Sequence, residues 1–196
     1  MMKNLGWDKT KSQTIEANYH ELYKVSDAYV QSKIQQACID GYVTVAFGLR
    51  VRTPLLKSVI YNSSMPYEAA AEGRTAGNAL GQSYCLLNNR AATAFMRKVR
   101  KSKYAHDIKL VAMIHDAIYL LIRDDIEVVK WVNDNLIKEM QWQDLPELDH
   151  PTVKLGANLD LFYRGWHQPI TLKNNASKSQ ILDTIIDAVN DYNNPN

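Results

Sequence analysis

The fold is decided by one stretch of sequence, IKLVAMIHDAIYLLI, which runs from Ile108 to Ile122. It contains two apolar runs separated by His115, Asp116 and Ala117. Both runs are short, rich in aliphatic residues and bounded by charged residues, which favours two strands over a helix. We therefore expect a buried β-hairpin whose tip carries Asp116.

Long helices are expected on both sides of this hairpin. The segment between Tyr67 and Arg100 contains no proline, so one long helix is predicted there. An earlier helix, over 12–40, is predicted to end at Gly41, which follows its last apolar position. The other expected elements are a hairpin over 42–54, a loop over 55–66, a helix over 126–142 capped by Asp124 or Asp125, a strand over 153–163, and a last helix beginning at Ser177 or Ser179. The predicted fold class is α+β, with a small antiparallel sheet packed on long helices.

The composition is that of an ordinary globular protein. Of the 196 residues, 46% are hydrophobic and 22% are charged, which argues against overall disorder. No run approaches the roughly 20 apolar residues of a membrane span, and the N-terminus lacks an apolar signal core, so no membrane partner is expected. Cys38 and Cys85 are too few for a disulfide framework or a thiolate metal site. We therefore expect a reducing, cytoplasmic location.

Charge is distributed unevenly along the chain. The net charge is only +2, yet residues 42–123 contain twelve basic and four acidic residues, whereas residues 124–196 contain six basic and twelve acidic ones. This asymmetry favours one surface for a polyanion, with solvated charge on long helices as the alternative. Charge alone does not distinguish DNA, RNA or an acidic protein as the partner.

Asp116 is the first candidate site residue. An ionised carboxylate between two apolar runs is unfavourable unless it is solvated, paired or bound to a cation. Mg²⁺ prefers oxygen ligands and usually takes only one or two protein carboxylates, so Asp116 is a candidate magnesium ligand. The alternative is an ordinary turn aspartate that reaches solvent.

The long helix has a polar stripe beside a glycine stripe. Arg74, Asn78 and Gln82 lie four residues apart, and so do Gly73, Gly77 and Gly81. Three glycines inside a helix destabilise it by ~3 kcal/mol relative to alanines, so close approach to the helix backbone is expected. Arg, Asn and Gln donate hydrogen bonds to base edges, which suits sequence-independent contact with a duplex minor groove. Close helix–helix packing through the glycines is the alternative.

Two further groups of residues have less specific patterns. Residues 97–103 contain five cations and no acid: Arg97, Lys98, Arg100, Lys101 and Lys103. Contact with phosphate is one interpretation of this run, and a solvated helix end is the alternative. Trp131, Trp142 and Trp166 are predicted to be core or half-buried anchors rather than platforms for base stacking.

Taken together and in this order, these motifs resemble the C-terminal part of family A DNA polymerases, the class of bacterial DNA polymerase I and many phage replicases. In that family a GYV…GRR hairpin in the fingers precedes an ER…N…Q helix and the HDE turn of motif C. The matching segments here, within residues 14–170, are Gly41-Tyr42-Val43 with Gly48-Leu49-Arg50, then Glu72 to Gln82, then Ile114-His115-Asp116.

The resemblance implies a role for each matched residue. Asp116 matches the motif C aspartate that binds the catalytic metal ions, and His115 matches the histidine near the primer end. Arg74, Asn78 and Gln82 match the helix residues that contact primer and template, and Arg50 matches a basic residue of the fingers hairpin. Ala117 departs from the family, because glutamate is common at that position.

The resemblance also implies that part of the active site is missing. The motif A aspartate and the nucleotide-binding residues of motif B have no counterpart in this sequence, and thumb and exonuclease regions do not fit within it. Two-metal catalysis needs carboxylates from both motifs, so a complementary chain is expected to supply motifs A and B together with the thumb and exonuclease regions. Primer–template DNA, a deoxynucleoside triphosphate and Mg²⁺ are the other expected partners.

These expectations divide the chain into three parts. Residues 1–65 are expected to be a partial fingers segment, residues 66–173 a palm with motif C, and residues 174–196 a helical extension. Met1-Met2 is typical of a natural start, so we expect a gene-split polymerase subunit, inactive alone and of viral setting. The alternative, which Ala117 favours, is a non-catalytic duplex-binding remnant or scaffold protein.

Overall fold

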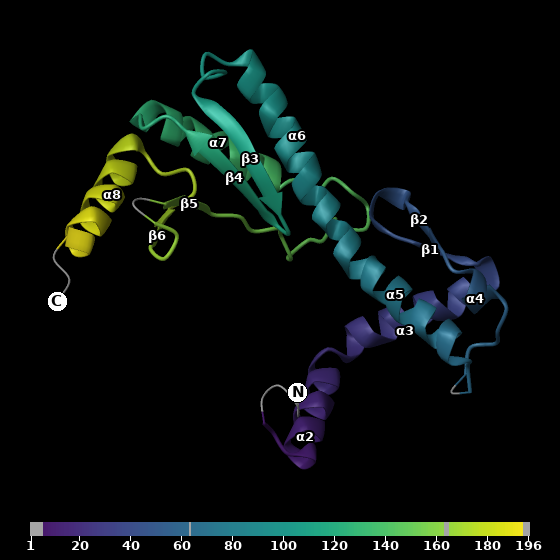
Figure 1. The fold of residues 1–196 in the computed structure, drawn as a ribbon. Coiled ribbons are helices and arrows are strands. Elements are labelled where there is room, and N and C mark those ends of the chain that lie inside the picture. Colours follow the sequence, from purple (N-terminus) through teal and green to yellow (C-terminus); the bar gives the residue numbers. More distant parts are fainter. Residues whose placement is uncertain (1–5, 63, 163–164, 194–196) are drawn as a thin grey trace. The chain divides into compact units, whose positions relative to one another are not determined.

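A computed structural model describes residues 6–62, 64–162 and 165–193, and the chain divides into two compact units, Met1–Tyr84 and Cys85–Asn196 (Figure 1). Each unit combines helices with two-stranded antiparallel sheets, which confirms the predicted α+β class. The boundary between the units falls within a short 3-10 helix, η2 (Ser83–Cys85). The assignment of fingers and palm to parts of the chain stays a prediction.

The N-terminal unit is built around two helices that pack on a small hairpin. Its elements are α2 (Lys9–Leu22), α3 (Lys24–Asp40), β1 (Tyr42–Thr44), the 3-10 helix η1 (Ala46–Gly48), β2 (Arg50–Arg52), α4 (Pro54–Lys57) and α5 (Tyr67–Gln82). The buried core joins α3, β1, α4 and α5 through Ile34, Ala37, Val43, Leu56, Ala76 and Leu80. Gly41 ends α3 as predicted, with φ of 77° in the left-handed region that favours glycine.

Two local predictions in this unit were wrong. The single helix expected over 12–40 is broken at Tyr23, which has a non-helical conformation between α2 and α3. The loop expected over 55–66 begins with the last three residues of α4, because Pro54 occupies the first helical position. The carboxylate of Glu72 on α5 accepts a hydrogen bond of 2.7 Å from the backbone N–H of Leu56. It thereby provides a partner for an N–H group that has none within the first turn of α4.

The single long helix expected between residues 67 and 100 was also wrong, because η2 separates α5 from α6 (Leu86–Lys101). Gly81 is a weak helix former just before the interruption. The Ser83 hydroxyl donates to the Leu80 carbonyl oxygen at 3.2 Å and accepts from the backbone N–H of Ala46 at 3.1 Å. Such side chain–backbone bonds compete with continued helix.

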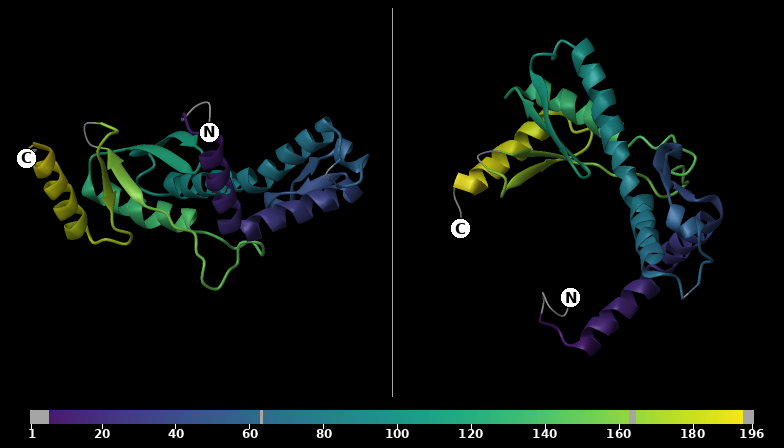
Figure 2. Two further views of the ribbon diagram at one scale, coloured as in Figure 1. Left: turned by 90° about the horizontal axis from the view of Figure 1, so that it is seen from below. Right: turned by 45° about the vertical axis from the view of Figure 1, so that its right-hand side comes forward.

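The C-terminal unit contains the predicted hairpin. Its elements after α6 are β3 (Ile108–Ile114), β4 (Ala117–Ile122), α7 (Ile126–Met140), β5 (Leu159–Phe162), β6 (Pro169–Leu172) and α8 (Lys178–Asn193). Strands β3 and β4 pair from Ile108↔Ile122 to Ile114↔Ala117, with an irregularity between Leu110 and Ala112. The hairpin lies along α6 in the views of Figures 1 and 2. It shares with α6 and α7 a core of Phe95, Val99, Ile108, Val128, Val132 and Leu136.

The end of this unit differs in part from expectation. Asp125 caps α7 as predicted, since its side chain accepts a hydrogen bond of 2.7 Å from the backbone N–H of Glu127. Of the strand predicted over 153–163, only residues 159–162 form a strand. Residues 153–158 are irregular, and Tyr163 lies outside the described residues. The partner strand β6 was missed because it begins at Pro169, a residue that is uncommon in strands.

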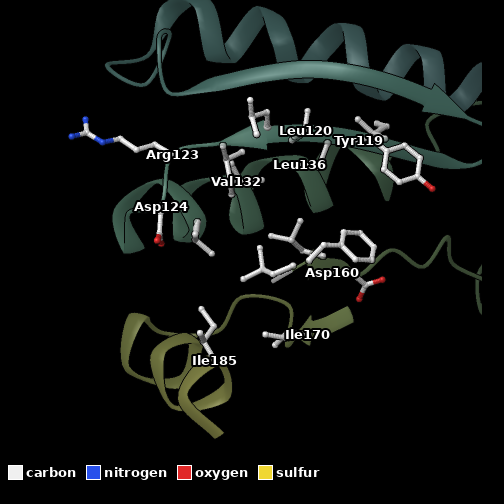
Figure 3. Close-up of a pocket in the computed structure, with 16 residues that line it drawn as sticks. Tyr119, Leu120, Arg123, Asp124, Val132, Leu136, Asp160, Ile170 and Ile185 are labelled. Carbon is white, nitrogen blue, oxygen red and sulfur yellow. The ribbon is translucent and has the colours of Figure 1, made fainter. Parts of the chain in front are cut away.

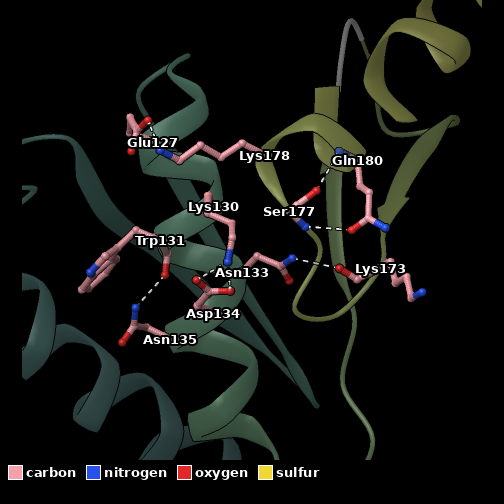
Figure 4. Close-up of polar contacts among 10 residues, drawn as sticks. All are labelled: Glu127, Lys130, Trp131, Asn133, Asp134, Asn135, Lys173, Ser177, Lys178 and Gln180. Carbon is pink, nitrogen blue, oxygen red and sulfur yellow. Dashed lines mark hydrogen bonds and ion pairs between the residues drawn. The ribbon is translucent and has the colours of Figure 1, made fainter. Parts of the chain in front are cut away.

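The last helix packs as part of the C-terminal unit. Ile181 on α8 is fully buried in a core with Val129, Ile170 and Leu172. Polar contacts join the same elements (Figure 4). Lys178 forms an ion pair with Glu127, and the side-chain amide of Asn133 donates a hydrogen bond of 2.9 Å to the carbonyl oxygen of Lys173. In the described part of the chain, no helix is both long and apolar enough to cross a membrane.

Candidate functional site

The tip of the β3–β4 hairpin is a two-residue turn made of His115 and Asp116. Both side chains are exposed, and the turn closes on the Ile114↔Ala117 pair. His115 has φ of 53°, whereas Asp116 has no positive φ. A positive φ is uncommon for a residue other than glycine, so His115 stores about 1 kcal/mol of strain. Strained residues of this kind gather at functional sites.

A buried asparagine on α6 donates hydrogen bonds to the backbone of this turn. Asn88, in the first turn of α6, is only 6% exposed, and its Nδ2 donates to the carbonyl oxygens of His115 (3.3 Å) and Ala117 (3.1 Å). These are the residues immediately before and after Asp116. Sequence reasoning missed Asn88, although a signal was present: Asn88, Ala91, Ala92, Phe95 and Val99 follow helical spacing and form the buried face of α6.

Asp116 does not form a metal site with the rest of the described chain. Within residues 6–62, 64–162 and 165–193, no group of three or more His, Cys, Asp or Glu side chains could hold a metal ion. One exposed carboxylate can offer oxygen ligands to Mg²⁺, which usually takes one or two protein carboxylates. The magnesium site at Asp116 stays a prediction.

The polar stripe of α5 is exposed at Arg74, Asn78 and Gln82. The neighbouring glycines serve mainly another purpose. A Cβ on Gly73 would contact Ile34 and Leu56 at 3.6 Å, and one on Gly77 would lie 3.1 Å from Val30, so these two glycines let α3 pack closely on α5. That is the alternative left open by the spacing. Gly81 is different, because a Cβ there would meet nothing within 4 Å.

Arg50 lies at the start of β2, where it pairs with Thr44. Its side chain is exposed, and its guanidinium lies 4.4 Å from the ring centroid of Tyr42. This cation–π contact holds the charge close to the hairpin. Arg50, Arg74, Asn78 and Gln82 all belong to the N-terminal unit, whereas His115, Asp116 and Asn88 belong to the C-terminal unit.

The cationic run near the end of α6 divides into paired and exposed residues. Lys98 pairs with Glu139 on α7 at 2.6 Å, and Arg90 pairs with the same carboxylate at 3.0 Å. Burial alone would raise the pKa of Glu139, but the hydrogen bonds from Lys98 and Arg90 outweigh it and lower the pKa. The other four cations, Arg97, Arg100, Lys101 and Lys103, are exposed.

The tryptophans at positions 131, 142 and 166 do not behave alike. Trp131 packs against Phe95 in the core, and the half-buried Trp142 lies 4.1 Å from the Arg90 guanidinium, as expected for anchors. The prediction was wrong for Trp166, which is 67% exposed. Its ring stacks between those of Tyr119 on β4 and Phe162 on β5, at centroid distances of 5.1 and 5.2 Å, so contact between aromatic rings replaces burial.

A mainly apolar cavity of about 390 Å³ lies between β4 and β5 (Figure 3). Every residue from Ile118 to Asp124 and from Leu159 to Phe162 lines it, with α7 and α8 forming other walls. In the described part of the chain β4 pairs only with β3, and β5 only with β6. The unpaired edges of two separate hairpins therefore border one cavity.

Comparison of the sequence with protein-family models gave no match, and comparison with curated proteins gave none either.

Proposed function

We propose that this chain is a subunit of a DNA-directed DNA polymerase that supplies one metal-binding aspartate and a helix that contacts the primer–template duplex. The observation that carries this proposal is the turn at His115 and Asp116: an exposed carboxylate on a strained turn, braced by a buried asparagine, at the end of an apolar hairpin. The resemblance of the ordered motifs to family A polymerases supports the same function.

In this proposal Asp116 provides carboxylate oxygens to Mg²⁺, and His115 lies beside the primer end. The bound ions would neutralise the charge that develops between the primer hydroxyl and the incoming triphosphate. A rigid position for Asp116 matters because small displacements of a catalytic group are costly in rate. The braced turn meets that requirement.

The exposed stripe of α5 is proposed to follow the minor groove of the duplex. Arg74 and Asn78 donate hydrogen bonds, and minor-groove acceptors are shared by all base pairs, so the contact would be independent of sequence. Gly81 leaves the backbone open beside the exposed Gln82, which permits close approach of the duplex there. Arg50 and the exposed cations near the C-terminal end of α6 would bind phosphates.

A second chain carrying motifs A and B, the thumb and the exonuclease is required for activity. We propose that one of its strands enters the cavity between β4 and β5 and pairs with both edges, because exposed strand edges favour addition of a strand. We place the complex in the cytoplasm, that of the host cell if the chain is viral.

The second candidate is a non-catalytic duplex-binding remnant, which Ala117 in place of glutamate favours. The two candidates differ in one experiment. The chain is purified together with the polypeptides that bind it in the cells where it is made, and nucleotide incorporation is measured on a primed template with Mg²⁺. Incorporation directed by the template supports the subunit, whereas duplex binding without incorporation supports the remnant.

A further inference from the structure

Asn88 contacts the turn in an unusual way, because its single amide group donates to backbone carbonyls on both sides of Asp116. Its Nδ2 donates to the carbonyl oxygens of residues 115 and 117, at 3.3 and 3.1 Å. The His115 carbonyl belongs to the peptide unit before Asp116, and the Ala117 carbonyl to the unit that joins Ala117 to Ile118, so the backbone is held on either side of Asp116. Asn88 is separated from the turn by more than 25 residues of sequence and reaches it from α6.

The orientation of the Asn88 amide is determined by its surroundings. The reverse orientation would place Oδ1 against two carbonyl oxygens, which repel it and which cannot donate. In the observed orientation Oδ1 is buried and has no hydrogen-bond partner among the described residues. A buried unpartnered acceptor is unfavourable, so it offsets part of the stability contributed by the two donated bonds.

We propose that Asn88 is a positioning residue, which fixes the left-handed conformation of His115 and thereby the place of Asp116 relative to the metal ions. The catalytic part of this inference rests on the proposed polymerase function. The structural part does not, because it concerns only the turn and α6. Asn88 does not touch the reacting atoms in this account and acts through the backbone of the turn.

The test replaces Asn88 with an apolar residue of similar size. Asn88→Leu removes both donated bonds together with the unpartnered oxygen, so the fold should be retained. Asn133→Leu is the matched control, because Asn133 is also buried in this unit, also has an unpartnered Oδ1, and donates to the Lys173 carbonyl oxygen instead of the turn. Thermal unfolding of each purified variant verifies that it is folded before any other measurement.

The first readout needs no catalysis. Backbone ¹⁵N order parameters of residues 115–117 should fall from about 0.85 toward 0.6 or lower in Asn88→Leu and stay unchanged in Asn133→Leu. Unchanged order parameters in a folded Asn88→Leu protein would overturn the inference. Loss of order in both variants would also overturn it, because the effect would then be general.

The second readout uses the complex with the polymerising partner. The Mg²⁺ concentration for half-maximal primer extension should rise on the order of tenfold in Asn88→Leu, as for other residues that orient a metal ligand, and not in Asn133→Leu. An unchanged Mg²⁺ requirement despite a loosened turn would overturn the positioning role. If the wild-type complex does not extend primers, the proposed function fails, and the order parameters still decide whether Asn88 holds the turn.

Discussion

Val30 on α3 lies directly over Gly77 on α5, so that a Cβ added to Gly77 would be only 3.1 Å from Val30 Cγ1. This contact explains why glycine stands inside a helix that alanine would stabilise. We expect Gly77→Ala to lower the stability of the N-terminal unit by about 1 kcal/mol, since crowding of a packed contact outweighs the gain in helix propensity. Urea unfolding of the variant and the wild-type protein measures the difference. A variant as stable as the wild type, or more stable, would show that α3 shifts to accommodate the added methyl group.

Gly81 is the matched position without such a contact, and its replacement should have the opposite effect. Gly81→Ala is expected to stabilise the N-terminal unit by up to about 1 kcal/mol, because a Cβ there meets nothing. The same change should weaken binding to duplex DNA several-fold if the duplex approaches the backbone at this point. Duplex affinity is measured by fluorescence anisotropy, and unchanged affinity would contradict the proposed groove contact.

Local sequence patterns predicted much of this fold. The apolar runs on either side of His115 and Asp116 identified β3, β4 and the exposed turn between them, because Lys109 is the only charged residue in the two strands. Gly41 marked the end of α3 for the same local reason. The elements that were missed depend on distant partners, such as α4, whose backbone is satisfied by Glu72 on another helix.

The candidate site was predicted less completely. Asp116 and the exposed stripe at Arg74 and Asn78 follow from residue type and spacing. Asn88 could not be assigned its role, because its bonds to the turn cross 27 and 29 positions of sequence. The glycine stripe was ambiguous, since spacing is equally compatible with packing against α3 and with a duplex.

The ion pairs around Glu139 should make stability depend on pH. Its pKa is lowered in the folded chain, so its contribution is fully present above the ordinary value of about 4.3 and is lost as the pH falls through the folded value. We expect Glu139→Gln to cost on the order of 1–2 kcal/mol at pH 7 and much less in acid. Denaturant unfolding of both proteins at pH 7 and pH 3 measures this, and a pH-independent difference would refute the assignment.

The exposed cations near the C-terminal end of α6 should make duplex binding sensitive to salt. Each phosphate contact contributes about −0.9 to the slope of log K against log salt concentration. The double variant Arg100→Gln and Lys101→Gln should therefore lower the steepness by about 2. As a control, Lys138→Gln with Lys154→Gln removes two exposed lysines from the acidic part of the chain. Equal slopes for all three proteins would exclude phosphate contact at α6.

Leu121 tests the proposed entry of a partner strand. It lines the cavity between β4 and β5, is 63% exposed, and pairs with Lys109 across the hairpin. Leu121→Glu should leave the chain folded, since the new carboxylate lies beside Lys109, yet it should weaken association with the second chain at least tenfold. Co-purification at equal expression measures this, and undiminished association would place the joint elsewhere.

The role of Asp116 is the central claim, and primer extension by the purified complex tests it most directly. Asp116→Asn keeps the size of the side chain but removes the charge that would hold the metal ions. Asp144→Asn is the control, because Asp144 is an exposed aspartate of the same unit that does not line the cavity proposed for the partner strand. Asp116→Asn is predicted to lower the extension rate by ~10³-fold or more without loss of association, whereas Asp144→Asn extends normally. Extension at the wild-type rate by Asp116→Asn would contradict the assignment of this chain.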